Sequence, residues 1–274
     1  MRPLTVFWAE EGGLPPADRG LAYGDGLFET IRMRGRQGTL LGRHLARLAR
    51  DAGRLGIPVD DRSLRPVVAE AVRRYGDRPE PGDWVLKLTL TRGAGGRGYR
   101  PDAGMRPHLL VSASPMPPLP APGGVSVDFS PVPLAVNPML AGIKSLNRLE
   151  QVMAARDLTP ELFELIQSNA QGQLVEGTRT NLLIRRADGW KTPPVASLAV
   201  AGVMRQWVLE RLRARGEPVA EVPLELADLM DGDCRCFYLL NSVLGVVPVA
   251  SVAGHHLPVD AGLATICDPL DTLE

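Results

Sequence analysis

A proline-rich segment divides the chain into two parts. Residues 115–124 contain five prolines and two glycines. Proline fixes φ and lacks a backbone N–H, so such a run cannot continue a helix or form a central strand. It is typical of an extended linker between domains. We therefore expect an N-terminal domain at 1–114, a linker at 115–124 and a larger C-terminal domain at 125–274.

The composition limits the classes of partner. Lys plus Arg and Asp plus Glu number 31 each, so the formal net charge is zero. Charge therefore does not favour nucleic acid or an anionic membrane as a partner. The N-terminus lacks the apolar core of a signal peptide, and no apolar run is long enough to span a membrane. We expect a soluble, cytoplasmic protein without a nucleic-acid or membrane partner.

The cysteine and histidine patterns do not indicate a metal site. Cys234, Cys236 and Cys267 are an odd number, and no two of them form a C-x-x-C pair. A zinc site would need more ligands at better spacing, so we expect buried, reduced thiols and no metal. The pair His255-His256 lies in a predicted turn and is expected to be exposed.

Hydrophobic periodicity predicts the elements of both parts. In the first part it predicts helices at 42–55 and 61–75, and strands at 4–8, 28–33, 83–92 and 108–113. In the second part it predicts strands at 125–132, 163–167, 173–176 and 237–240, and helices that begin near Ser145 and at Gly202.

Lys144 stands at the predicted start of one of these helices. Leu146, Leu149 and Val152 recur at helical spacing, and Ser145 is a good N-cap residue. The helix N-terminus favours anions, so the pKa of an ammonium group there should fall. Only the neutral amine adds to an aldehyde. The spacing alone leaves a solvated surface lysine as the alternative.

The segment Ala141-Gly-Ile-Lys-Ser-Leu-Asn-Arg-Leu-Glu-Gln-Val152 resembles the pyridoxal-phosphate (PLP) lysine segment of fold-type IV enzymes. These are the branched-chain aminotransferases, the D-amino acid aminotransferases and the 4-amino-4-deoxychorismate lyases. The resemblance extends from Asp18 to about Pro248 and is greatest to the lyases. It implies PLP as the cofactor, bound by Lys144, and an α+β fold in two domains. The N-terminal domain should be a smaller α/β domain and the C-terminal domain a larger β-barrel-like domain with helices.

Two further motifs imply how the cofactor is held. His44-Leu-Ala-Arg-Leu48 matches the family's His-x-x-Arg-Leu, which implies that Arg47 binds the cofactor phosphate through charge-assisted hydrogen bonds. Glu176-Gly-Thr-Arg-Thr-Asn-Leu matches Glu-Gly-x-x-x-Asn-Leu. This implies that Glu176 pairs with the pyridine nitrogen and keeps it protonated. Without the resemblance, Arg47 could not be told from its neighbours, and Glu176 would be a solvated residue at a strand end.

Two other segments match phosphate-binding turns of the family. Gly202-Val203-Met204-Arg205 stands where a helix begins, and free N–H groups at a helix start bind phosphate. The resemblance implies this role for Gly202, Val203 and Met204; an ordinary helix start is the alternative. Ser242, after the strand at 237–240, occupies the place of a second phosphate-binding turn.

A glycine-rich basic loop implies the class of substrate. Residues 93–100 read Gly-Ala-Gly-Gly-Arg-Gly-Tyr-Arg, which alone could be a hairpin connection. Together with the preceding Thr-Arg, the loop resembles that of the lyases, whose substrate is a dicarboxylate. This implies that Arg97, Tyr99 and Arg100 bind substrate. Tyr23, in the family's first signature, is implied to line the substrate pocket.

Glu29 and Thr30 bear on the reaction. The residue after this Glu is Gly in typical branched-chain aminotransferases and Thr in the lyases, whereas Glu29 itself matches the aminotransferases. Alternation along the strand puts the two side chains on opposite faces, so only one can face the cofactor. If Thr30 faces the cofactor, its hydroxyl could relay protons between Lys144 and the pyruvate that the lyases release from their substrate.

The resemblance implies the activity of these lyases. They eliminate pyruvate from aminodeoxychorismate and release 4-aminobenzoate, the aromatic precursor of folate. It also implies a homodimer with an active site at the domain interface. The alternatives are an aminotransferase for branched-chain or D-amino acids, and a binding or structural protein that has the same fold but no PLP.

Overall fold

The computed structural model describes residues 4–76 and 82–274. The described chain forms two compact units. Unit 1 consists of the chain up to Pro117 together with Lys144–Asn147 and Thr272–Glu274, and unit 2 consists of Pro118–Ile143 and Arg148–Asp271. We keep the domain boundaries predicted from the proline-rich segment as a proposal.

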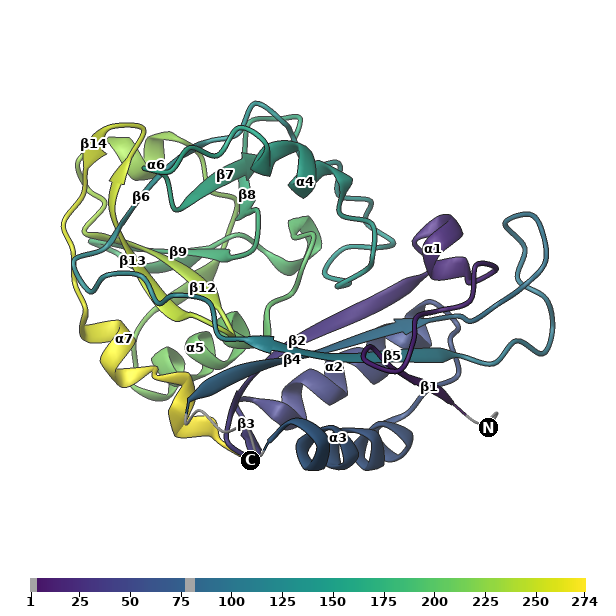
Figure 1. Ribbon diagram of the computed structural model, residues 1–274. Coiled ribbons are helices and arrows are strands. Elements are labelled where there is room, and N and C mark those ends of the chain that lie inside the picture. Colours follow the sequence, from purple (N-terminus) through teal and green to yellow (C-terminus); the bar gives the residue numbers. More distant parts are fainter. Residues whose placement is uncertain (1–3, 77–81) are drawn as a thin grey trace. The chain divides into compact units, whose positions relative to one another are not determined.

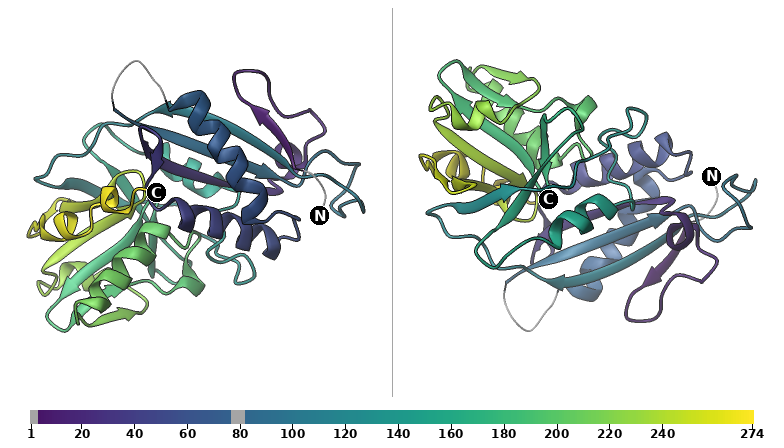
Figure 2. Two further views of the ribbon diagram at one scale, coloured as in Figure 1. Left: turned by 90° about the horizontal axis from the view of Figure 1, so that it is seen from below. Right: turned by 90° about the horizontal axis from the view of Figure 1, so that it is seen from above.

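Unit 1 contains a mixed five-stranded sheet with its two long helices on one face (Figure 1). Its strands, in the order β1-β5-β4-β2-β3, are β1 (Thr5–Trp8), β5 (His108–Pro115), β4 (Asp83–Thr91), β2 (Gly26–Arg34) and β3 (Gln37–Gly38). Its helices are α1 (Arg19–Tyr23), α2 (Leu41–Arg54) and α3 (Asp61–Tyr75). Helix α2 packs against β2, and α3 lies beside α2 in all views (Figures 1 and 2). The α/β character predicted for this part is confirmed.

The alternation of side chains along β2 explains why α2 covers one face of this sheet. Leu27 and Ile31 are fully buried, and they lie opposite Leu90 and Leu86 of β4 in the antiparallel register. Directly opposite residues point to the same face, so these four side chains form one apolar surface. Helix α2 covers it with its own apolar face, and burying each aliphatic side chain contributes about 1.5–3 kcal/mol.

The main sheet of unit 2 closes into a barrel. The strands that form it, in order, are β9 (Asn181–Arg186), β12 (Cys236–Asn241), β13 (Gly245–Val252), β6 (Val125–Phe129), β7 (Glu164–Ser168) and β8 (Leu174–Gly177). Strand β8 pairs back with β9, which closes the ring. Further pairings add β10 (Gly189–Thr192), β11 (Val219–Glu221) and β14 (His255–His256). The predicted two-part α+β fold with a barrel-like second part is confirmed.

Helices surround this barrel (Figure 1). They are α4 (Leu149–Ala155), α5 (Val203–Ala214), α6 (Ala227–Met230) and α7 (Gly262–Ile266), with short 3-10 turns at Val195–Ser197 and Pro269–Thr272. Helix α4 contacts β7, α5 contacts β12 and α7 contacts β13. In the part of the chain that the structure describes, no helix is long and apolar enough to cross a membrane.

Several smaller predictions are also confirmed. The three cysteines are free and buried, and His255 and His256 are exposed. The predicted strands and the helices α2, α3 and α5 are present with ends that differ by a few residues. One boundary is wrong, because α4 begins at Leu149 and not near Ser145.

Candidate functional site

The lysine segment is a strand-like segment and not a helix start. Phe28 N donates to Lys144 O at 3.0 Å, and Leu146 N donates to Gly26 O at 3.0 Å. An isolated antiparallel bridge joins Leu27 to Ser145. These backbone groups are used in pairing with β2, so they cannot form helical hydrogen bonds, and α4 starts only at Leu149. The predicted effect of a helix dipole on Lys144 therefore does not apply.

The side-chain amino group of Lys144 lies over an aromatic ring of β2. Its Nζ is 4.2 Å from the centroid of the Phe28 ring, and the residue is half-buried. Thr30 is two residues further along the same strand, so its side chain lies on the same face as that of Phe28. Lys87 of β4 lies directly opposite Thr30. The structure therefore places Phe28 and Thr30 of β2 and Lys87 of β4 on the same face of the sheet, the face that Lys144 contacts.

Lys87 was not recognised in the sequence. Its Nζ lies 5.6 Å from the centroid of the Phe28 ring, and its side chain is exposed. A lysine among the apolar residues of Trp84-Val-Leu-Lys-Leu-Thr-Leu is the signal that could have found it. The pairing with Thr30, however, depends on a register that only the folded sheet reveals.

Glu29 lies on the opposite face, where it meets two residues of α2. Arg47 donates from Nε to Oε1 at 2.7 Å and from Nη2 to Oε2 at 2.6 Å. His44 Nδ1 is 2.6 Å from Oε2. All three side chains are buried. Glu29 therefore holds Arg47 in the two-point geometry that the guanidinium group favours, and it does not face Lys144.

Electrostatics fix the protonation of this cluster. Burial alone would raise the pKa of Glu29, but Arg47, and then His44, lower the pKa to about 2. Burial also lowers the pKa of His44, in spite of Glu29. An ionised carboxylate only accepts, so neutral His44 must donate from Nδ1. Its buried Nε2 then carries a lone pair, which has no hydrogen-bond partner among the described residues.

The structure brings two of the predicted substrate residues together. The rings of Tyr23 and Tyr99 have centroids 5.5 Å apart, and Gly98 N donates to the Tyr23 hydroxyl at 3.2 Å. Arg97 and Arg100 belong to the same loop and are exposed. Tyr23 and the glycine-rich loop thus form one surface of aromatic and basic side chains in unit 1.

In unit 2, Glu176 and Asn181 hold the residues that precede α5. The two residues face each other across β8 and β9. Buried Glu176 accepts from Val200 N at 3.0 Å. Asn181 donates from Nδ2 to Val200 O at 2.9 Å, and its Oδ1 accepts from Gly202 N at 3.1 Å. Through these hydrogen bonds, Glu176 and Asn181 join the start of α5 to the β8–β9 pairing that closes the barrel.

The start of α5 has the features of an anion site. Gly202 is the N-cap, in an extended conformation, and no side chain caps the helix. A Cβ at Gly202 would lie 2.1 Å from Asn181 Oδ1, so only glycine allows this approach. Val203 and Met204 follow in the first turn, where backbone N–H groups have no helical acceptor. Ser242 is half-buried and follows Asn241, whose Oδ1 accepts from two later backbone N–H groups in the same turn.

Glu164 of β7 is a second residue that the sequence analysis missed. It is fully buried, and burial raises its pKa. It accepts from Arg179 N at 2.5 Å and from the Thr180 hydroxyl at 2.6 Å. A Cβ at Gly177 would lie 2.6 Å from Glu164 Cδ. Glu164 thus fixes the turn between Glu176 and Asn181, and explains why glycine follows Glu176.

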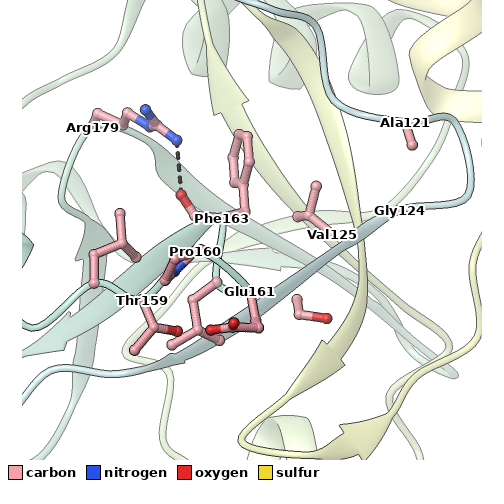
Figure 3. A pocket seen from close by; sticks show the side chains of 11 residues that line it. Ala121, Gly124, Val125, Thr159, Pro160, Glu161, Phe163 and Arg179 are labelled. Atoms are coloured by element: carbon pink, nitrogen blue, oxygen red, sulfur yellow. Dashed lines mark hydrogen bonds between the residues drawn. The ribbon is translucent and has the colours of Figure 1, made fainter.

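Two pockets of unit 2 are lined by none of the predicted site residues. One pocket of about 720 Å³ lies between residues 121–126 and 158–163 (Figure 3). At its rim, Arg179 lies over the ring of Phe163 at 4.6 Å and donates to Phe163 O at 2.8 Å. Another, of about 630 Å³, is lined by residues 134–138 and 169–171 together with Ala196 and Ser197. Within residues 4–76 and 82–274, no group of three or more acidic, His or Cys side chains could hold a metal ion.

Comparison with known proteins identifies the family. The model of class IV aminotransferases (Amino-transferase class IV) matches residues 26–252. The chain belongs to this family. The match to the class IV aminotransferases runs from β2 to the end of β13, and it includes Thr30, Arg47, Lys144, Glu176 and the start of α5.

The chain is similar both to aminodeoxychorismate lyases and to an aminotransferase. It is 32% identical to an aminodeoxychorismate lyase of Vibrio harveyi, over 93% of this chain and 94% of that one. It is 33% identical to a putative branched-chain-amino-acid aminotransferase of Methanocaldococcus jannaschii, over 86% and 82%. Among solved structures, a 4-amino-4-deoxychorismate lyase from Pseudomonas aeruginosa matches with a TM-score of 0.86 and 38% identity, covering 93% of each chain.

The buried Glu29 should make the protein sensitive to acid. Its folded pKa of about 2 lies below its ordinary value of 4.5, so its stabilisation is complete above the higher value and is lost as pH falls towards the lower one. That shift corresponds to on the order of 3 kcal/mol. We expect Glu29→Gln to remove much of the fall in unfolding free energy between about pH 5 and pH 2, measured by urea denaturation.

The exposed Asp157 supplies the control. Asp157→Asn should leave the acid dependence of the parent unchanged. Parallel curves for the parent and Glu29→Gln would mean that the pKa of Glu29 is the same in the folded and the unfolded protein.

Proposed function

We propose that this chain is a PLP-dependent 4-amino-4-deoxychorismate lyase, which releases pyruvate and leaves 4-aminobenzoate for folate synthesis. The observation that carries the proposal is the position of Thr30 on the face of β2 that Lys144 contacts, with Glu29 on the other face. The similarity to the lyases from V. harveyi and P. aeruginosa supports it.

The donor set fits PLP. Lys144 offers an amine, Glu176 a buried carboxylate for a ring nitrogen, and the uncapped start of α5 a set of backbone N–H groups for phosphate. The residues that would hold the phosphate are Arg47, Gly202, Val203, Met204 and Ser242. When bound, PLP supplies an electron sink through its protonated ring.

The chain's own residues move the protons. The neutral Nζ of Lys144 takes the proton from the carbon that bears the substrate's amino group. The same Nζ, now charged, can return a proton to the departing pyruvate, so one residue acts first as base and then as acid. The Thr30 hydroxyl relays this proton, a task that transamination does not require. Formation of the aromatic ring favours the elimination.

Basic residues of unit 1 would bind the two carboxylates of the substrate. Arg97, Tyr99 and Arg100 project from the glycine-rich loop, and Tyr23 packs against Tyr99. Guanidinium groups bind carboxylates through two parallel hydrogen bonds. Lys87, on the face of Thr30, adds a further cation to this set.

A homodimer is part of this proposal. Leu149, Val152 and Met153 of α4 are between 50% and 77% exposed, and Met139 is 81% exposed. Large apolar side chains exposed three and four residues apart on one helix, as in α4, form a surface typical of protein interfaces. We assign this surface to contact with a second copy of the chain, which sedimentation velocity of the purified protein tests.

A class IV aminotransferase is the second candidate. Glu29 matches the aminotransferases at its position, and the relative from M. jannaschii carries that description. In the present structure Glu29 is occupied with Arg47 and His44. The role of Glu29 is therefore to hold α2 against β2, which both the lyase reaction and transamination could use. Its presence does not by itself favour transamination.

The direct test is turnover of aminodeoxychorismate. We expect the PLP-loaded protein to release 4-aminobenzoate and pyruvate in equal amounts, and Lys144→Ala to lose nearly all of this activity because it lacks the proposed base. Lys191, which pairs with Asp188 on the surface, gives the matched control, and Lys191→Ala should retain it. A parent protein that makes no 4-aminobenzoate and transaminates branched-chain or D-amino acids would overturn the lyase assignment.

Arg47 should be distinguished from its neighbours by cofactor affinity. Loss of a buried charge-assisted contact costs about 1.5–3 kcal/mol, so Arg47→Ala should weaken PLP binding by about 10-fold to 150-fold. Arg50→Ala, which alters a residue with a 54% exposed side chain, should change it little. The quantity to measure is the dissociation constant of PLP by absorbance titration.

Arg47→Ala also leaves Glu29 buried without its cation. Adding Glu29→Gln should therefore recover thermal stability without recovering PLP affinity. If the double variant also recovers the affinity, Arg47 acts by neutralising Glu29 and not by binding phosphate.

Thr30 should affect the lyase reaction selectively. Removing a positioned proton relay costs on the order of 100-fold in rate. Thr30→Ala should therefore lower kcat for 4-aminobenzoate release by that factor, while the absorption spectrum of bound PLP and slow transamination of amino acids stay near the parent. Thr30→Ser keeps the hydroxyl and should retain most of the activity. Release of 4-aminobenzoate at the parent rate by Thr30→Ala would reduce Thr30 to a strand residue.

A further inference from the structure

A buried arginine outside the predicted site holds the glycine-rich loop. Arg19, the first residue of α1, donates from Nη1 to Gly98 O at 2.8 Å and from Nη2 to Tyr99 O at 2.7 Å. Its side chain is 5% exposed. One guanidinium group thus binds two consecutive carbonyl groups of the loop and fixes the peptide between them.

The third side of this guanidinium group is held by Asp25. Arg19 Nε donates to Asp25 Oδ2 at 2.8 Å. Arg92, directly after β4, donates to both carboxylate oxygens of Asp25 at 2.8 and 2.9 Å. Burial alone would raise the pKa of Asp25, but Arg92 and Arg19 outweigh it and lower the pKa. Asp25 is therefore an ionised anchor that orients Arg19 towards the loop.

The backbone ties the beginning of the loop to the same segment. Arg19 N donates to Gly93 O at 3.0 Å, and Gly95 N donates to Ala17 O at 3.2 Å. The end of the loop is held by Arg19 and by the Tyr23 hydroxyl. Gly98 has a φ of 93°, which disfavours any other residue. The loop backbone is therefore fixed at both ends, while its side chains at Arg97, Tyr99 and Arg100 remain exposed.

The geometry requires arginine. The planar guanidinium group presents donors in a fixed fork, whereas the ammonium group of lysine is a single flexible point. Lysine could contact Asp25 or one carbonyl group, but it could not hold both loop carbonyl groups and Asp25 at once. The guanidinium group also lies 4.8 Å from the centroid of the Tyr23 ring, an arrangement that favours its planar cation.

We propose that Arg19 is a positioning residue that sets the affinity for the dicarboxylate substrate through the loop backbone, without touching the substrate. The identity of the ligand rests on the proposed function, which assigns the loop to the carboxylates of the substrate. Arg19 fixes the loop before the substrate binds, so substrate binding does not have to supply the free energy of ordering the loop.

The first test separates substrate affinity from chemistry. In the PLP-loaded protein, Arg19→Lys should raise KM for aminodeoxychorismate about tenfold or more, while kcat stays within about threefold and the absorption of bound PLP is unchanged. Arg186 also pairs with carboxylates and donates to a backbone carbonyl, that of Asp228. Arg186→Lys is thus the matched control and should leave KM unchanged. An unchanged KM, or an equal fall in kcat and PLP binding, would overturn the proposal.

The second test needs no turnover. Amide hydrogen exchange of residues 93–100 should become faster in Arg19→Lys, and exchange in the strands of unit 2 should not change. Unchanged exchange in the loop would also overturn the proposal. If Arg19→Lys does not fold, Asp25→Asn can be used instead. It removes the carboxylate charge that orients the Arg19 guanidinium group, and it should give the same changes in exchange and KM.

The outcomes distinguish this proposal from the proposed function. Failure of the parent to convert aminodeoxychorismate would refute the lyase assignment, and the exchange measurement would still decide whether Arg19 fixes the loop. Normal turnover by the parent, with unchanged exchange and KM in Arg19→Lys, would refute only the role of Arg19.

Discussion

Strand β2 is the element on which the organisation of unit 1 depends. On one face, Glu29 holds Arg47 and His44 of α2 in a buried cluster. On the other, Phe28 lies under Lys144, and Thr30 shares the face of Phe28. Because side chains alternate along a strand, a shift of one residue would exchange the two sets. The cluster of Glu29, Arg47 and His44, with the apolar residues around it, therefore fixes the register that puts Phe28 in contact with Lys144.

This dependence also explains why the lysine segment is not helical. The apolar spacing after Ser145 is helical in character, but the main-chain groups of Lys144 and Leu146 are bound to β2. Local propensity is a weak preference that tertiary hydrogen bonds override. The resemblance to the family singles out Lys144 from its motif alone, whereas the local argument about a helix dipole assumed a helix start that the structure does not have.

Much of the fold could be predicted from sequence, because it depends on local patterns. The periodicity of α2 and α3 and the alternation of β2 are both short-range signals. The residues that were missed depend on contacts distant in sequence. Lys87 is defined by its partner Thr30, Glu164 by a turn some 15 residues later, and Arg19 by carbonyl groups 79 and 80 residues away. A single sequence holds no record of such pairings.

Closure of the barrel has a consequence for the tolerance of unit 2 to mutation. An open sheet can lose a strand at its edge, or let it slip in register, without disturbing the others. In a closed ring the join between β8 and β9 has strands on both sides, and it carries Glu176 and Asn181. Glu164 fills the space that a side chain at Gly177 would need. A side chain at Gly177 would therefore collide with Glu164, and because β8 and β9 each have a strand on their other side, neither strand could move away to relieve the collision.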